Sequence, residues 1–228
     1  LEKTSGNLNI KLSQTGGLAT AGSDYVLPAT ISVPDGGTTA TLTLNVADDA
    51  FFENNETATI TISNSSDPAV GIGTPSITAT IIDNDNGVAS VSADLSVNSN
   101  GNETGPLPVV YAVTLSKTNY THFPITFSIN PSGGTATAVA DYANFAGGTI
   151  SVPHGASVGT LSVSVVNDLL FENTEDVEST ISVPGDPAVY INTASAVGTI
   201  ADSDNAAGSV NAVLSATRNG NETGTVAI

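Results

Sequence analysis

Carboxylates that recur at a fixed spacing are the residues of this chain best suited to chemistry. Of 22 Asp and Glu side chains, 15 occupy positions matched by an internal repeat with an offset of 119 residues. Carboxylates gathered by folding repel one another unless a cation lies between them or one takes up a proton. Acids without Cys or matched His suit a hard cation such as Ca²⁺ better than zinc or copper. Alternatively, the acids only keep a weakly charged chain soluble, but solubility does not require the same acids at the same offset.

The balance of charge excludes several classes of partner. The chain has 228 residues, only 4 of them Lys or Arg, and a formal net charge of −18. Nucleic acid and anionic lipid both require a cationic surface, so we expect neither as a partner. The apolar runs are too short to span a bilayer, so we expect no membrane insertion within this segment. The absence of Cys excludes disulfides and thiol chemistry.

The internal repeat predicts the domain organisation. Residues 31–86 and 150–205 align without gaps and share 28 identities in 56 positions. We expect an incomplete unit at 1–86 that lacks its first strands, a complete unit at 87–205, and the opening strands of a third at 206–228. One unit follows another without a flexible linker, which predicts a rod. The lack of Met predicts a processed or excised chain.

Short alternating segments predict β structure. Apolar and small polar residues alternate over five or six positions, the pattern of strands buried on one face. Turns rich in Gly, Asn and Pro separate these segments at spacings that predict about seven strands per unit. The expected fold is therefore all-β, with tandem immunoglobulin-like β-sandwiches. Two matched pairs of aromatic residues are expected to anchor the cores: Tyr25 with Tyr142, and Phe52 with Phe171. The clearest expected strands are 41–46, 58–62, 77–81, 125–129 and 160–165.

Four motifs in the first unit are specific enough to suggest a family. They are Thr20-Ala-Gly-Ser-Asp-Tyr25, Val33-Pro-Asp-Gly36, Val46-Ala-Asp-Asp-Ala-Phe-Phe-Glu-Asn-Asn-Glu56 and Ile82-Asp-Asn-Asp85. In this order they resemble the Calx-beta domain of sodium/calcium exchangers, integrin beta-4 and many bacterial surface proteins. The resemblance covers the whole repeat.

The resemblance implies Ca²⁺ as the cofactor and a set of carboxylate ligands in each unit. Two departures from the family pattern remove charge: Asn167 replaces an Asp, and Asn84 or Ser203 stands in the middle of the closing acidic triplet. Fewer ions or weaker binding are therefore expected. The implied metal ligands are Asp24, Asp48, Asp49, Glu53, Glu56, Asp83 and Asp85 in the first unit, Glu103, Asp141, Asp168, Glu172, Glu175, Asp202 and Asp204 in the second, and Glu222 in the third.

Other chemistries fit the sequence less well. The segment 83–87 resembles the start of an EF-hand loop, but its Gly comes one place early and no closing Glu follows. A glycosidase needs two carboxylates in a cleft lined with aromatic residues, and Trp is absent. His122 and His154 have no counterparts in the repeat, so we interpret them as surface residues. We expect no enzymatic activity.

Two functions remain open. The first is a structural or adhesive module of a long extracellular or cell-surface protein or filament, in which Ca²⁺ rigidifies the loops and the junctions between units. The alternative is a calcium-sensing regulatory domain, as the exchanger resemblance implies. The expected partners are calcium and neighbouring repeats. Two explanations fit the incomplete units at 1–86 and 206–228. Either another copy of the chain is joined head to tail by donation of the strands at 206–228 to the unit at 1–86, or the chain is a piece of a longer continuous array in which the neighbouring strands belong to the same polypeptide.

Overall fold

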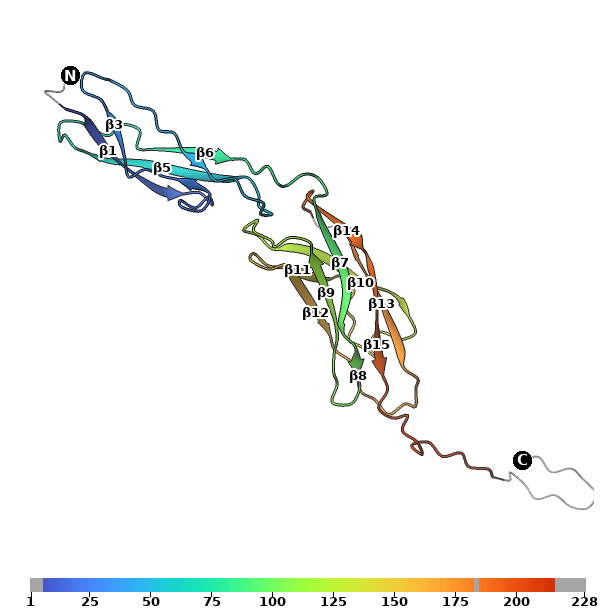
Figure 1. The fold of residues 1–228 in the computed structure, drawn as a ribbon. Coiled ribbons are helices and arrows are strands. Elements are labelled where there is room, and N and C mark those ends of the chain that lie inside the picture. The colour runs from blue at the N-terminus through green and yellow to red at the C-terminus, as the bar shows by residue number, and fades with distance from the viewer. Residues whose placement is uncertain (1–5, 183–184, 216–228) are drawn as a thin grey trace, which may run out of the picture.

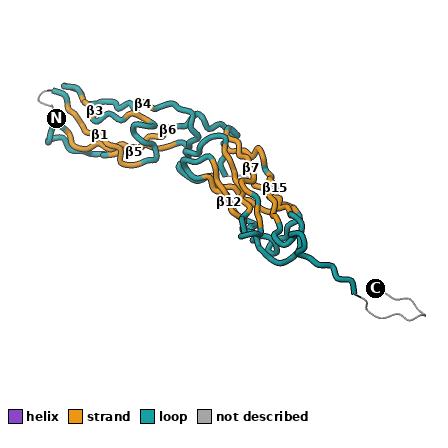
Figure 2. The backbone as a smooth tube through the Cα atoms, turned by 60° about the horizontal axis from the view of Figure 1, so that its bottom comes forward, coloured by secondary structure: helices purple, strands orange, loops and turns teal. Residues whose placement is uncertain are grey.

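The computed structural model describes residues 6–182 and 185–215. Figure 1 shows two β units placed end to end, with a bend between them. Viewed from another direction in Figure 2, the same elongated arrangement consists of strands and loops. None of the residues described belongs to a helix long and apolar enough to cross a membrane. We call residues up to 86 unit 1 and residues 87–205 unit 2.

Unit 2 is a sandwich of two sheets. One sheet has the strand order β11-β10-β13-β15-β8, and the other has the order β12-β9-β7-β14. The strands are β7 (Val91–Ser99), β8 (Gly101–Asn102), β9 (Val109–Leu115), β10 (Ile125–Gly134), β11 (Gly148–Val152), β12 (Val158–Val163), β13 (Glu175–Ser182), β14 (Val189–Thr193) and β15 (Ser195–Ala201).

The first and last strands of unit 2 each pass from one sheet to the other. β7 pairs in parallel with β14 in one sheet, and β8 pairs in parallel with β15 in the other. β7 and β8 are two parts of one interrupted strand, and so are β14 and β15. Unit 2 therefore has nine separate segments but seven strands, as the sequence predicts for an immunoglobulin-like sandwich. The all-β fold is therefore confirmed.

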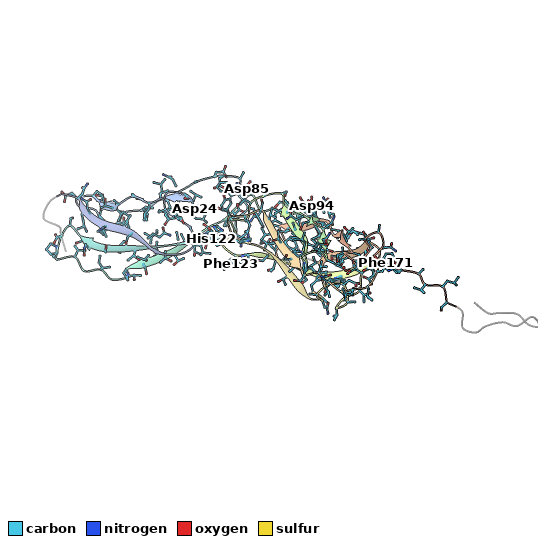
Figure 3. All side chains as sticks on the ribbon, turned by 90° about the horizontal axis from the view of Figure 1, so that it is seen from below. Asp24, Asp85, Asp94, His122, Phe123 and Phe171 are labelled. Carbon is cyan, nitrogen blue, oxygen red and sulfur yellow. The ribbon has the colours of Figure 1, made fainter. Side chains whose placement is uncertain are left out.

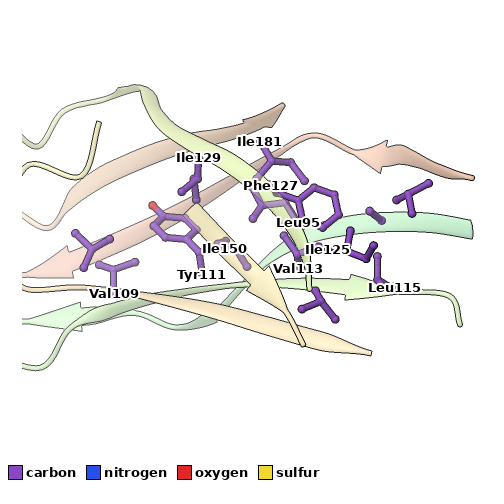
Figure 4. Close-up of a cluster of buried hydrophobic side chains, with 14 of the residues drawn as sticks. Leu95, Val109, Tyr111, Val113, Leu115, Ile125, Phe127, Ile129, Ile150 and Ile181 are labelled. Carbon is purple, nitrogen blue, oxygen red and sulfur yellow. The ribbon is translucent and has the colours of Figure 1, made fainter. Parts of the chain in front are cut away.

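The core of unit 2 lies between these two sheets. Leu95, Val113, Phe127, Ile150 and Ile181 belong to one continuous cluster of buried side chains, shown in Figure 4. Their strands carry the alternating pattern, so every second side chain faces the opposite sheet. The buried Tyr111 side chain donates a hydrogen bond from its hydroxyl to the Val177 carbonyl across the core (2.6 Å).

Unit 1 has one four-stranded sheet of order β3-β1-β5-β6 and a two-stranded sheet of β2 and β4. Its buried apolar cluster is small and consists of Leu12, Ala19, Tyr25, Ala58 and Ile60. The strands are β1 (Leu8–Gly16), β2 (Tyr25–Val26), β3 (Thr30–Val33), β4 (Asn45–Val46), β5 (Glu56–Ser65) and β6 (Ser76–Ile81).

The prediction of a strand over 41–46 is mostly wrong, because only Asn45–Val46 forms one. In unit 2 the residues 160–163, which match 41–44, lie in β12, and β12 is hydrogen-bonded to β9. The described part of unit 1 contains no counterpart of β9. Alternation of apolar residues indicates which face of a strand is buried, but a strand forms only where a neighbour accepts its backbone hydrogen bonds. The strand expected over 160–165 ends at Val163. Beyond it the chain pairs with the segment 141–143 instead, through an isolated bridge between Val165 and Tyr142.

The two matched phenylalanines have opposite environments. Phe52 of unit 1 is 0% exposed and belongs to the core cluster of unit 2, and its carbonyl accepts the backbone N–H of Tyr120 (2.9 Å). Phe171 is 62% exposed at the far end of unit 2. The expectation that Phe171 anchors a core is therefore wrong, and Phe52 is part of the junction between the units. Tyr25 and Tyr142 are buried as expected.

Candidate metal centres

The acids of unit 1 come together at the end that faces unit 2. They are supplied by the turn before β2, the loop between β4 and β5, the first residue of β5 and the segment after β6. Figure 3 shows Asp24 and Asp85 beside the junction. One cavity of about 260 Å³ is lined by all seven predicted site residues of this unit: Asp24, Asp48, Asp49, Glu53, Glu56, Asp83 and Asp85.

The acids of unit 2 gather at the corresponding end, away from unit 1. One group consists of Glu103, Asp202 and Asp204, and another of Asp141, Asp168 and Glu172. In each group one oxygen from every carboxylate lies within 4.8 Å of the others. Glu175, the remaining predicted residue, shares a side-chain hydrogen bond with Asp141. Glu222 lies outside the described residues.

Local backbone geometry fixes several of these carboxylates. The N–H of Asp204 donates to Asp202 Oδ1 (2.8 Å), and the N–H of Glu172 donates to Asp202 Oδ2 (3.1 Å). The N–H of Ser203 donates to Glu103 Oε2 (3.2 Å). The hydrogen bond from Asp204, followed by that from Glu172, holds the pKa of Asp202 below its ordinary value. The sequence places Asp202 and Asp204 in a tight turn after β15, where successive N–H groups point inward.

Other acids of both units have raised pKa values, which favour the protonated form. Burial, followed by the charge of Asp24, raises the pKa of Glu56 from its ordinary value of 4.5 to about 7. Burial also raises the pKa of Glu175 to about 7, with the hydrogen bond to Asp141 and its charge adding to the effect. For Glu53, burial and then Asp49 raise the pKa to about 6. Water and backbone N–H donors therefore do not fully compensate the negative charge of the acids in either unit.

The donor set fits a hard cation. Asp83 Oδ2 is buried in unit 1 and has no hydrogen-bond partner among the residues described. A buried carboxylate oxygen without a donor is costly, and a cation would satisfy it. The groups consist of carboxylates, and oxygen donors of this kind bind Ca²⁺ or Mg²⁺ in preference to soft metals. The acidic groups could therefore hold a metal ion.

The residues that replace acids in the family pattern form one hydrogen bond in each unit. In unit 1, Asn84 Nδ2 donates to Asp48 Oδ1 (3.1 Å). In unit 2, Asn167 stands at the position of Asp48, and its Oδ1 lies 3.3 Å from the Ser203 hydroxyl. The unit 1 pair retains one charge and the unit 2 pair has none. The site in unit 2 is accordingly the less negative of the two at this edge.

A loop of unit 2 reaches the acids of unit 1. His122 Nδ1 lies 3.1 Å from Glu56 Oε1, which is the one ion pair found within the described ranges. Lys117 Nζ donates to the carbonyl of Asp85 (3.5 Å), and Asn54 Nδ2 donates to the carbonyl of Thr121 (3.3 Å). His122, interpreted from the sequence as a surface residue, is partly exposed but contacts Glu56 at the junction. The repeat could not reveal this contact, because it is made between two consecutive units and His122 has no matching His.

Without metal, the stability of the protein is expected to fall as the pH rises from about 5 to about 8. The folded-state pKa values of Glu56 and Glu175 lie above the unfolded value of 4.5, at about 7. The folded chain then binds more protons than the unfolded chain between these values. The stability from these groups is present below the unfolded pKa and is lost as the pH rises through the folded one. Thermal melts in chelator across this range would measure the effect.

The control for this pH dependence is the double variant Glu56→Gln with Glu175→Gln. Glutamine keeps the size of each side chain and removes its titration, so the melting temperature should vary less with pH. An apo protein that becomes more stable toward about pH 8 would contradict the assignment of these carboxylates as crowded and partly buried.

The chain is similar to a known domain family and to several solved structures. The family model of the Calx-beta domain matches residues 2–86 and 103–204. No curated protein matches the chain. Among solved structures, the apo form of the Calx CBD1 domain is 19% identical, with 50% of this chain and 98% of that chain covered and a TM-score of 0.42. CBD12 from CALX1.2 is 17% identical, with 88% of this chain and 89% of that chain covered and a TM-score of 0.37. The calcium binding domain CBD12 of CALX1.1 is 20% identical, with 79% of this chain and 69% of that chain covered and a TM-score of 0.31.

Proposed function

Because the chain belongs to the Calx-beta domain family, we propose that it is a non-enzymatic, calcium-binding structural or adhesive module of a long extracellular or cell-surface protein. The observation that carries this proposal is the collection of acids at one end of each unit. All seven predicted residues of unit 1 line a single cavity, and six of those in unit 2 fall into two compact groups. A solubilising surface does not need to concentrate its charge in this way.

The residues that would hold calcium are the acids of the two groups in unit 2 and of the cavity in unit 1. In unit 2 one ion would be held by Glu103, Asp202 and Asp204, and another by Asp141, Asp168 and Glu172. In unit 1 the seven acids of the cavity would share the same task. Calcium supplies positive charge and a coordination shell that accepts oxygens from several loops at once. The chain supplies the carboxylates and, through the N–H groups of Glu172 and Asp204, fixes the orientation of Asp202.

Calcium in unit 1 would also stiffen the rod. The cavity is bordered by residues that contact unit 2 at three places: Glu56 at His122, Asp85 at Lys117 and Asn54 at Thr121. Loops that repel one another cannot keep such contacts in one arrangement, whereas loops tied to a common ion can. This geometry supports a load-bearing role in a filament or array of repeats.

The same geometry supports the alternative, a calcium-sensing regulatory domain, because an ion in unit 1 would influence contacts with unit 2. Affinity separates the two functions. A sensor should bind with a Kd of about 10⁻⁷ to 10⁻⁵ M, whereas extracellular modules operate at about 10⁻⁴ to 10⁻³ M. The uncharged residues Asn167, Asn84 and Ser203 favour weaker binding, and therefore the structural module. Isothermal titration of Ca²⁺ into the intact chain measures this difference.

Calcium binding itself is tested by Asp202→Asn. We expect this variant to weaken Ca²⁺ binding to unit 2 by at least about tenfold, since it removes charge from the centre of a three-carboxylate group. The matched control is Asp176→Asn, which makes the same chemical change at an exposed position of β13 outside both groups. Equal titrations for the two variants would overturn the proposed site.

A further inference from the structure

The two histidines of the chain lie against each other at the junction between the units. His122 and His154 are the only histidines in the sequence, and 32 positions separate them. Their ring centroids are 5.0 Å apart, with 43° between the ring planes. Glu56 of unit 1 completes a group of three, because its Oε1 lies 3.1 Å from His122 Nδ1. Two imidazoles and a carboxylate therefore meet where unit 1 contacts unit 2, at the place where Figure 3 labels His122.

The spacing of this group is close to that of ligands around one zinc ion. Bonds from zinc to nitrogen or oxygen are about 2.0–2.1 Å long, so two ligand atoms of a tetrahedral site lie about 3.3 Å apart, and two bound imidazole rings have centroids about 5 Å apart. The 3.1 Å between His122 Nδ1 and Glu56 Oε1 and the 5.0 Å between the rings are near these values. Imidazole with carboxylate is a donor set that binds zinc, whereas the groups made only of carboxylates suit calcium.

A buried asparagine ties together the two loops that carry the histidines. The Nδ2 of Asn119 donates to the carbonyls of Phe123 (2.9 Å) and Val152 (3.0 Å), and the side chain is fully buried. The backbone carbonyl of Asn119 accepts the N–H of Gly155, the residue after His154 (2.7 Å). These bonds join the loop before β10 to the turn between β11 and β12. Supporting contacts of this kind set the positions of metal ligands.

The backbone of His122 has an unusual conformation that brings its ring to the junction. Its φ is +66°, in the left-handed region that residues other than Gly rarely adopt, and such conformations concentrate at functional sites. Its N–H donates to His154 Nδ1 (3.3 Å). The side chain of His122 is 30% exposed, and His154 is exposed too. An ion can therefore reach both rings from solvent, and the exposed His154 side chain can turn to direct a nitrogen at it.

We propose that His122, His154 and Glu56 bind one zinc ion at the junction, with water from the solvent as the fourth ligand. Both histidines belong to unit 2 and the carboxylate to unit 1, so the ion links the two units directly. The site goes beyond the proposed function, because it takes a different metal through a different donor set. Glu56 also lines the acidic cavity of unit 1. Zinc and calcium therefore compete for this one carboxylate, and the other six acids of the cavity remain for calcium.

The test is titration of Zn²⁺ into the intact chain, followed by NMR of the imidazole rings. Saturating Ca²⁺ is present throughout, so that the acidic groups do not take up the zinc. Because the chain has two histidines, a histidine-selective spectrum contains the signals of these two rings alone. We expect both rings to shift together and to reach their end points at one Zn²⁺ per chain, and Mg²⁺ at the same concentrations to shift neither. A shift of one ring alone, or of neither, would overturn the site.

Two single variants assign the histidine ligands. His122→Gln and His154→Gln should each weaken Zn²⁺ binding by at least about tenfold, because losing even a supporting contact of a metal site costs about 10- to 100-fold. The matched control is Asp35→Asn, since Asp35 occupies the position of His154 on the equivalent turn of unit 1. This control should bind zinc like the original chain. A His154→Gln variant with the affinity of the original would contradict the proposal.

The contribution of unit 1 is tested by Glu56→Gln, which should also weaken Zn²⁺ binding by at least about tenfold. The matched control is Glu53→Gln, which removes another carboxylate of the same cavity. Among the described residues it is Glu56, and not Glu53, that pairs with His122, so the control should retain zinc binding. Equal zinc affinities for the two variants would show that the ion does not link the units. The calcium proposal is judged separately, by the titration of Asp202→Asn at the far end of unit 2.

Discussion

Phe52→Ala is expected to lower the free energy of unfolding of unit 2 by about 3 kcal/mol or more, although the residue belongs to unit 1. Its side chain is fully buried in the core cluster of unit 2. Truncation leaves a cavity in that cluster and removes the apolar contact that joins the units. Chemical denaturation measures the loss of stability, and small-angle scattering should show a wider range of angles between the units.

The repeat itself supplies the control for this substitution. Phe171→Ala changes the same residue type at the matched position of unit 2, where the side chain is 62% exposed. We expect its effect on stability to stay within about 0.5 kcal/mol. Similar losses for the two variants would show that Phe52 acts within its own loop and does not link the units.

The same pair of residues shows what sequence comparison can and cannot predict. Phe52 and Phe171 occupy matched positions in similar segments, and the sequence therefore predicts the same environment for both. Their burial differs because it depends on what lies beyond the loop: unit 2 covers Phe52, and no described residue covers Phe171 in the same way. Repetition predicts local structure well, but it cannot predict burial created by a neighbouring unit.

The acids were easier to predict than the strands. Matched Asp and Glu residues lie in turns and at strand ends, and the ends of a β-sandwich bring such loops together whatever the details of pairing. The prediction for 41–46 depended on a partner strand that the described part of unit 1 lacks. The contributions of Lys117 and His122 were missed because their contacts cross from one unit to the other. Only the folded arrangement of two consecutive units places the loop that carries them against the acids of unit 1.

Calcium is expected to raise the melting temperature of the protein, and most strongly that of unit 1. A ligand at about 100 times its Kd stabilises the folded state by about 2.7 kcal/mol per site, which corresponds to about 10 °C for a domain of this size. Unit 1 has the small core of five buried apolar residues, Leu12, Ala19, Tyr25, Ala58 and Ile60, so it should unfold first in chelator. Its acidic cavity holds seven carboxylates beside the junction, so binding there removes the most repulsion.

Calorimetric scans in chelator and at increasing Ca²⁺ measure this effect, with Mg²⁺ at the same concentrations as the comparison ion. Because Mg²⁺ requires a compact octahedral shell and releases water reluctantly, it should stabilise the protein less than Ca²⁺. The lower-temperature transition should shift most in the original chain, and Asp202→Asn, which lies in unit 2, should leave that shift unchanged. Melting curves and scattering profiles that do not differ between chelator and calcium would show that the carboxylates are held together without a metal ion. The raised pKa values of Glu56 and Glu175 would then describe the resting state of the protein rather than a site awaiting its cation.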